Sequence, residues 1–491
     1  SVSDRDTIAA ELQVMSRLSG RLRTLADVEC VSVEATAAAR RHWLDMRHAA
    51  RRIVNCHLTN ACPQLAYVTR YSCIGPHNLA SYSYHPTHFR PGGDVIIQSG
   101  TSPTSPTRAL LRGRLGDGHV RGIDLHWDAD RFVFAFTPQP GWNNEPVSDG
   151  GSYPEPTHLY EMKVDGGGLE QLTNDRKWID TEPTYLPCGD VAFSSDRCAI
   201  GSECGSFRQN AGTLNLYRLD RGAGQIRRLT VNKDYDRYPH CLDNGLIAYL
   251  HWDYTERQFY SPHSIWTVRP DGSMADAVFK AHVQGGPFSL RDARSIPDTS
   301  RLVAVACGHH NRAEGSVTIV DPSRGINRRE AMRYVTPYAG NTEGGYGNVA
   351  AVAEGGVPTR GGLYQHPWAI SDKSFLVSYA YDYPKSSSFA VYYIDVFGHH
   401  ELIRADSVLE CAFPMPLTVR PTPPILPDNT TDDGVDLLTS LVKQKQTDEA
   451  VCYLADVHAD LPGVAPGTVK YLRISERVNW PSLELTHTIE C

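Results

Sequence analysis

Two aligned stretches of sequence decide the fold: HLYEMKVDGGGLEQLTNDRKWIDTEPTYLPCGDVAFSSDRC at His158–Cys198 and NLYRLDRGAGQIRRLTVNKDYDRYPHCLDNGLIAYLHWDY at Asn215–Tyr254. In both, a Leu-Tyr pair opens an apolar run, an acidic Gly-rich turn follows, and a Leu-Thr pair ends 13 residues after the tyrosine. An Asp, a Pro and, ten residues after the Pro, an aromatic residue complete each copy. Chance rarely preserves so many offsets, so the stretches are copies of one unit of short strands and turns.

Less regular copies of this unit lie on both sides of the two stretches. Four further copies begin at the runs DVIIQSG (94–100), SIWTVRPDGS (264–273), SVTIVDPSRG (316–325) and AVYYIDVFGHHELI (390–403). The total is six copies, and the last lacks a final strand, which LAYVTRY (65–71) can supply from the other end of the chain. Closing a ring in this way removes exposed sheet edges. The sequence therefore predicts an all-β fold, a six-bladed β-propeller over residues 65–420.

The regions outside the repeats predict three further segments. Residues 1–64 predict a helical segment, because apolar residues recur there at spacings of three and four. These residues are Leu12, Met15, Leu18, Leu22 and Leu25. The proline-rich stretch 421–434 predicts an extended linker. Strand-like runs resume over 435–491 and predict a small C-terminal β-rich extension, which stops before such a domain would be complete and suggests truncation.

The composition limits the classes of partner. The 491 residues carry a net charge of -8, whereas nucleic-acid-binding proteins usually present a basic surface, so no nucleic-acid partner is expected. No apolar run reaches the roughly 18 residues of a membrane helix, so no membrane span is expected.

The cysteines and one sequon indicate the compartment. The chain has 12 cysteines and no CxxC motif, so zinc ribbons are not expected. We favour disulfides, with Cys198 and Cys204 as the first candidate pair, over the alternative of buried free thiols. Asn429 begins an Asn-Thr-Thr sequon and is a candidate glycosylation site. Together these features predict a secreted, extracellular or lumenal protein.

The repeat resembles the TolB-like (PD40) propeller repeat of bacterial envelope proteins. Six stretches point to one narrower family within this class: EPTYLPCGDVAFSSDRC, HWDYTER, VACGHHN, HPWAISDKSFLVSY, YYIDVFGHHELI and PGTVKYLRI. They look like signatures of the family of the hydrazine synthase alpha-subunit middle domain, which includes secreted planctomycete-type proteins, and they extend the match from about Leu65 to Ile474. The resemblance implies a secreted propeller that docks to other protein subunits.

One departure from that family concerns haem. The resemblance would imply CxxCH motifs for covalent haem, but the chain has none. Cys56-His57 comes nearest, and Ile53 stands where the first cysteine is needed. Because a c-type haem is attached through that motif, no covalent c-type haem is expected.

Histidines at the expected strand exits are the candidate metal ligands. His251 and Asp253 follow one strand, His309 and His310 follow the equivalent strand of the next unit, and His366 belongs to the unit after that. If these exits meet at the propeller mouth, the five side chains can hold a single metal ion, since imidazole and carboxylate suit zinc, iron or copper. The alternative is that the histidines are hydrogen-bonded structural residues, and that Trp252 packs between blades.

The repeated acidic pairs, Asp180 with Glu182 and Asp234 with Asp236, are expected to fix loops.

The predicted function is a binding or assembly module within a larger complex. No Ser-hydrolase, zinc-protease or nucleotide-binding motif occurs, so we favour a non-catalytic role and assign no catalytic residue. The alternative is a redox subunit related to hydrazine synthase alpha, which uses a metal or a partner's haem at the propeller mouth. A third hypothesis is glycan binding through Trp252 and Trp368.

Overall fold

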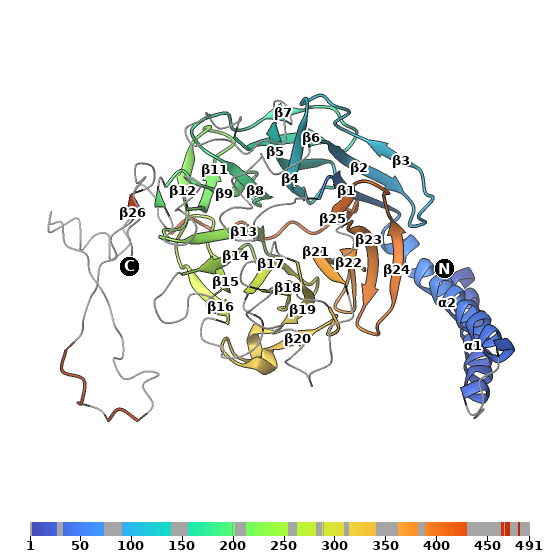
Figure 1. The fold of residues 1–491 in the computed structure, drawn as a ribbon. Coiled ribbons are helices and arrows are strands. Elements are labelled where there is room, and N and C mark those ends of the chain that lie inside the picture. The colour runs from blue at the N-terminus through green and yellow to red at the C-terminus, as the bar shows by residue number, and fades with distance from the viewer. Residues whose placement is uncertain are drawn as a thin grey trace, which may run out of the picture.

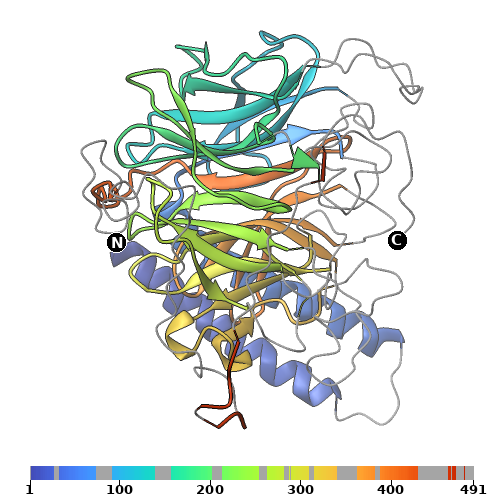
Figure 2. The same ribbon diagram turned by 90° about the vertical axis from the view of Figure 1, so that its left-hand side faces the viewer.

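The chain folds as a ring of β-sheets around a central axis, shown by the computed structural model in two views (Figures 1 and 2). The structure describes residues 2–26, 33–72, 91–138, 156–198, 200–201, 213–253, 263–280, 287, 289–308, 314–339, 362–381, 388–429, 463–465, 467–471 and 480–481. The predicted all-β propeller with an N-terminal helical segment is confirmed. None of the described helices is long and apolar enough to cross a membrane.

The strands fall into four layers from the axis outward. The innermost are β4 (Gly118–Leu125), β8 (Asp180–Tyr185), β13 (Tyr235–Cys241), β17 (Ser289–Ser295), β21 (Leu363–Ala369) and β25 (Glu410–Pro416). The second are β1 (Gln64–Arg70), β5 (Arg131–Pro138), β9 (Val191–Ser195), β14 (Ile247–Trp252), β18 (Leu302–Cys307) and β22 (Ser374–Ala380). The third are β2 (Gly93–Ser99), β6 (His158–Lys163), β11 (Asn215–Leu219), β15 (His263–Val268), β19 (Ser316–Val320) and β23 (Ala390–Asp395). The outermost are β3 (Thr107–Ala109), β7 (Glu170–Gln171), β12 (Ile226–Arg228), β16 (Asp276–Phe279), β20 (Met332–Tyr334) and β24 (His400–Arg404).

Antiparallel pairing joins these strands into six four-stranded units among the described residues. A single parallel pair between His263 of β15 and Ser289 of β17 links two of the units into one eight-stranded sheet. Large apolar side chains fill the space between the units, and Phe132, Phe193 and Phe375 are fully buried. Each such side chain stabilises the fold by about 1.5–3 kcal/mol relative to its exposed state.

The ring closes where the two ends of the propeller region pair. β1 pairs with β2 on one side and with β25 on the other. The unit therefore takes three strands from the N-terminal side and one from the C-terminal side. The predicted stretch LAYVTRY forms β1 and closes the ring, as expected. Arg70 stabilises the junction, because its Nε donates to Glu410 at 2.6 Å and its Nη1 to the Val120 carbonyl of β4 at 3.2 Å.

A β-bulge recurs in every inner strand. The residue at the bulge has positive φ in five of the inner strands, at Glu182 (54°), Tyr238 (55°), Asp292 (55°), His366 (51°) and Phe413 (53°). The sixth bulge, in β4, falls at Arg121. A non-glycine residue rarely adopts this conformation, and a bulge redirects the side chain of the extra residue. All six bulge residues line the central channel.

The N-terminal helices form an arm that extends from the ring (Figure 1). Helices α1 (Val2–Ala26) and α2 (Val33–Ala61) pack together, and Leu58 of α2 is buried in the core that contains β1. Arg47 and Arg51 of α2 donate to the two carboxylate oxygens of Glu401 on β24, at 3.0 and 3.1 Å. The arm is therefore anchored at its base by both apolar and ionic contacts.

A proline-rich segment crosses one end of the channel. We call residues 417–429 the axial strap; Figure 1 shows it in orange, running from β25 across the middle of the ring towards β13. Its Arg420 N–H donates to the Trp127 carbonyl at 2.8 Å, and its Asn429 side chain donates to Ser273 at 3.2 Å. The described part of the predicted linker is thus packed on the propeller. Of the C-terminal extension, β26 (Trp480–Pro481) pairs with β10 (Ile200–Gly201).

Candidate functional site

His251 lies on β14 between two carboxylates. Its Nδ1 is 2.7 Å from Asp236 and its Nε2 is 3.3 Å from Asp253, which is also one of the predicted ligands. Burial lowers the pKa of His251, but the charge of Asp236 and the hydrogen bonds to both carboxylates outweigh burial and raise that pKa to about 10. A protonated imidazole donates from both ring nitrogens, which matches a carboxylate on each side of the ring.

Trp252 beside it is a packing residue. It is 1% exposed, and its ring stacks on Tyr235 at 5.7 Å and on His263 at 5.1 Å between centroids. This burial agrees with the alternative that Trp252, the last residue of β14, is a packing residue and not part of a binding site. Trp368 is also buried, at 8% exposed, so neither tryptophan offers an open face for a sugar.

The structure places His366 away from a strand exit. It is the bulge residue of the inner strand β21, and its ring lies 3.7 Å from the Phe413 ring between centroids. Burial lowers its pKa to about 3, and the positive charges of Arg70 and Arg294 add to the effect, so the ring is neutral. His366 lines the channel with Asp292 and does not contact His251 among the described contacts. His309 and His310 lie outside the described residues, so the five-residue metal site stays a prediction.

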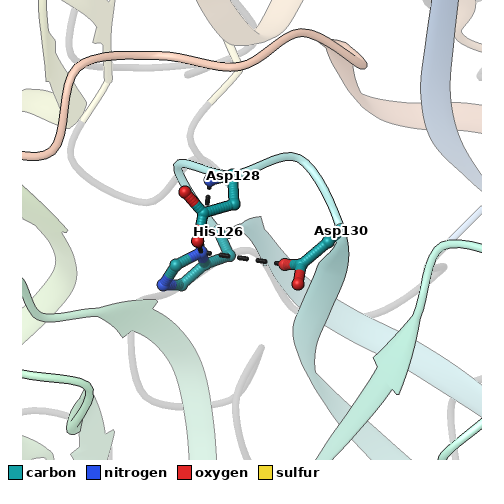
Figure 3. A group of neighbouring side chains, drawn as sticks. All are labelled: His126, Asp128 and Asp130. Atoms are coloured by element: carbon teal, nitrogen blue, oxygen red, sulfur yellow. Dashed lines mark hydrogen bonds and ion pairs between the residues drawn. The ribbon is translucent and has the colours of Figure 1, made fainter.

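Within the described ranges, one group of three His and Asp side chains brings its ligand atoms within 4.8 Å of one another: His126, Asp128 and Asp130 (Figure 3). The group lies in the turn between β4 and β5. The turn itself explains the arrangement, because His126 Nδ1 accepts from the Asp128 N–H at 3.2 Å and Asp130 accepts from Arg131 at 2.8 Å. The two carboxylates are 65% and 56% exposed, which is typical of a solvated turn.

The described cysteines show no disulfide with one another. Cys198 Sγ lies 3.2 Å from the Thr213 carbonyl, and its predicted partner Cys204 is outside the described residues, so that pair stays a prediction. Cys62 and Cys411 are buried thiols, and burial raises the pKa of each to about 12. Asn429 is exposed, as a glycosylation site requires, and its modification stays a prediction.

Ion pairs between neighbouring units surround the channel. Glu182 of β8 accepts from the Arg237 side chain and, at 3.0 Å, from the Tyr238 N–H of β13. Asp292 of β17 accepts at 2.5 Å from His240 of β13, and its Oδ2 atom is buried with no partner among the described residues. These contacts hold the inner strands in fixed positions relative to one another.

The repeated acidic positions thus have two different roles. Asp180 binds within its own unit, accepting from Ser195 at 2.8 Å and from Arg197 at 2.7 Å, as expected of a structural residue. Glu182, two residues later, faces the channel and binds the next unit, which the sequence interpretation missed. A signal was present: four of the five positive-φ bulge residues directly precede a proline, as in Glu182-Pro183 and His366-Pro367.

A cavity of about 870 Å³ lies at the end of the channel where the inner strands finish. We call it the axial cavity. Its walls include one residue from the end of each inner strand, namely Asp124, Thr184, Cys241, Ser295, Trp368 and Pro416. The strap contributes residues 418–423. The cavity is therefore built by every unit of the ring and bordered by the strap.

Two arginines approach one tryptophan at this cavity. The guanidinium carbon of Arg294, from β17, is 5.1 Å from the Trp368 ring centroid, and that of Arg420, from the strap, is 4.7 Å away. Arg420 also donates to the Leu125 carbonyl, while its Nε is buried with no hydrogen-bond partner among the described residues. Cation–π contact stabilises each arginine without supplying a counter-charge.

The structure is similar to solved propeller proteins. A hydrazine synthase chain from Kuenenia stuttgartiensis superposes with a TM-score of 0.55 and 16% identity, over 76% of this chain and 49% of that chain. TolB from Acinetobacter baumannii gives 0.43 and 12%, over 75% and 72% of the two chains. A chain of a nidogen/laminin complex gives 0.39 and 11%, over 71% and 98%.

At 16% identity, the likeness to the hydrazine synthase chain shows the fold alone. The chain spans about half the length of the hydrazine synthase chain. No family model and no curated protein sequence matches the chain. The propeller predicted from the repeats is confirmed, while membership of the narrower hydrazine synthase family stays a prediction.

Proposed function

We propose that this chain is a non-catalytic binding module that holds a ligand at the axis of its propeller and works within a larger extracytoplasmic assembly. The axial cavity supports this proposal most strongly. Its volume of about 870 Å³ suits a small molecule, and its walls combine apolar side chains with charged and hydroxyl groups that can orient a ligand. Such a site orders its ligand without needing a nucleophile or a general base.

The walls of the cavity are supported by a rigid frame. Arg237 with Glu182 ties one unit to its neighbour, Arg70 with Glu410 joins the two chain ends within the closing unit, and all four side chains are at least 88% buried. A site whose walls are held in this way loses little conformational entropy when it binds. This rigidity favours binding over a function that requires large movements of the ring.

Membership of an assembly is supported by the helical arm. Its outer surface carries large apolar side chains, with Leu12 54%, Trp43 53% and Leu44 39% exposed. Exposed aromatic and aliphatic groups of this kind are enriched at protein interfaces. The number of cysteines and the exposed Asn429 support an oxidising compartment.

Native mass spectrometry of protein purified without denaturation from its source tests the proposal. We expect an additional bound mass of a small molecule, and we expect Thr418→Trp, which places an indole in the cavity, to abolish it. Thr104→Trp is the matched control, because Thr104 is exposed on the β2–β3 turn. A bound mass that survives Thr418→Trp in a folded protein would contradict an axial site.

Metal content and visible absorption of the same sample test the proposal that the chain is non-catalytic. We expect neither stoichiometric iron, copper or zinc nor a Soret band. A Soret band, or one metal ion per chain, would contradict this part and support a redox role.

A further inference from the structure

Two arginine side chains lie beside Trp368 at the wall of the axial cavity. Arg294 Nε is 3.5 Å from Asp292 Oδ1, but His240 already donates to that oxygen at 2.5 Å. No ion pair of Arg420 is found among the described residues, and the one described hydrogen bond of its side chain goes to the Leu125 carbonyl. Two guanidinium groups thus share one indole. Arg294 shares Asp292 with His240, and Arg420 has no salt bridge among the described residues, although Asp124 and Asp243 lie near enough to act on its charge.

The other carboxylates of the cavity are engaged or lie in turns. Asp124 accepts from the Thr184 hydroxyl at 2.9 Å and from the Tyr185 N–H at 3.0 Å. Asp243 and Asp298 lie in the turns that follow β13 and β17. They add negative charge at the cavity wall, which disfavours a ligand with several negative charges.

Besides its charged, serine and threonine side chains, the lining includes a group of apolar residues. Trp127, Ile370, Pro416, Val419 and Pro421 all border the cavity. A ligand that fills this volume therefore needs an apolar body, and a single oxyanion is enough to bind the arginines. Guanidinium groups match the planar geometry of a carboxylate especially well.

We propose that the axial cavity binds a small organic monocarboxylate, whose oxygens accept hydrogen bonds from Arg294 and Arg420 and whose apolar part lies against Trp127 and the prolines of the strap. This rests on the proposed function of axial binding and names the class of ligand. Arg420 belongs to the strap, so the ligand also links the strap to β17 and β21.

Calorimetric titration of the full chain with benzoate tests the proposal. Benzyl alcohol has the same ring without charge, benzylamine has the opposite charge, and inorganic phosphate is an anion without an apolar body. We expect benzoate to bind at least about tenfold more tightly than the other three, because only benzoate combines an apolar ring with an oxyanion that accepts charge-assisted hydrogen bonds. Arg420→Gln should weaken benzoate about tenfold, whereas Arg301→Gln, which removes a partly exposed arginine paired with Asp372, should not.

The outcomes separate this inference from the proposed function. Tighter binding of benzyl alcohol, benzylamine or phosphate at a site blocked by Thr418→Trp would overturn the carboxylate inference and leave axial binding intact. Unchanged benzoate affinity in Arg420→Gln would overturn it as well. If none of the four probes binds and the native protein carries no bound mass, both the carboxylate inference and the proposed axial binding are overturned. Circular dichroism and thermal melting of each variant establish that it is folded.

Discussion

The His251 cluster and the axial cavity both hold cations out of solvent, but they pair them differently. His251 has a carboxylate at each ring nitrogen, and Asp236 in turn accepts from Asn232 at 2.9 Å. Arg420 has a tryptophan face, a carbonyl and a buried Nε without a described partner. A fully paired cation contributes to the fold, whereas an incompletely paired one at a cavity is available to a ligand.

His366 adds a third case to this comparison. It is the same residue type as His251, yet burial, with a smaller contribution from nearby arginines, lowers its pKa and keeps it neutral. Sequence spacing placed both histidines in one candidate metal site, but their chemistry follows from the burial and the neighbouring charges that the fold gives each of them. The predictions below test this difference, from the largest expected effect to the smallest.

Asp236→Asn should have the largest effect on stability. Asp236 is 1% exposed, and its loss leaves the His251 imidazolium without its closer carboxylate. Breaking a buried ion pair costs about 3–5 kcal/mol, so the free energy of unfolding should fall by that order. Urea denaturation measures it.

Asp253→Asn provides the control for that variant. The Asp253 side chain is 42% exposed and lies 3.3 Å from His251, so the loss should be below about 1 kcal/mol. Equal losses in the two variants would show that the pairing of His251 is not what stabilises this unit. Neither variant should change benzoate binding.

The pH dependence of stability should distinguish His251 from His366. The folded pKa of His251 is raised to about 10, so its contribution is complete below the unfolded pKa of about 6.5 and is lost between about pH 6.5 and 10. The folded pKa of His366 is lowered to about 3, so stability is lost as pH falls from about 6.5 towards 3 and the unfolded chain takes up the proton. Each slope should reach at most about 1.4 kcal/mol per pH unit.

Two variants assign these slopes to their residues. His251→Gln should flatten the alkaline side of the curve, and His366→Asn should flatten part of the acid side while its amide oxygen still accepts from the Phe413 N–H. Urea denaturation at intervals of pH gives the curves. An alkaline slope that persists in His251→Gln would contradict the raised pKa.

The repeat was readable from sequence because it is local. The offsets from Tyr160 to Phe193 and from Tyr217 to Tyr249 each run from the third strand of one unit to the second strand of the next unit along the chain, and LAYVTRY was recognised as the closing strand. The strap was not readable, because its role depends on contacts such as Arg420 with Trp368, which are far apart in the chain. Its prolines predicted only an extended segment.

The channel residues were missed for a related reason. The repeated Asp and Pro stood out in the sequence. The residue directly before the Pro varies in type, from Glu182 to Tyr238 to His366. What repeats there is a backbone conformation, and a backbone conformation leaves no single residue type in the sequence. Five positive-φ positions aimed at one channel emerge only when the units are arranged around the axis.

Gly245 lies in a turn that contacts the strap, and Gly189 lies in a matching turn that does not, so the variants Gly245→Ala and Gly189→Ala test that contact. The two glycines occupy matching turns, with φ of 85° and 95°, so an alanine should cost each about 1 kcal/mol of strain. A Cβ at Gly245 would also meet the Pro424 carbonyl of the strap, whereas one at Gly189 meets nothing within 4 Å. Gly245→Ala should therefore cost about 1 kcal/mol more in thermal or urea unfolding and should weaken benzoate binding. Equal effects would show that the strap does not rest on this turn.

Asp128→Asn and Asp130→Asn should have the smallest effect. Both carboxylates are exposed, and the turn keeps its His126 contact to the Asp128 N–H because that donor is backbone. Exposed ion pairs such as Asp130 with Arg131 contribute about 0–1 kcal/mol, so each variant should remain within about 0.5 kcal/mol of the parent. Calcium or zinc should not raise the melting temperature of the parent more than that of Asp128→Asn. A metal-dependent rise that the substitution removes would make this turn a metal site, and the fully paired His251 would then be the wrong place to have looked for one.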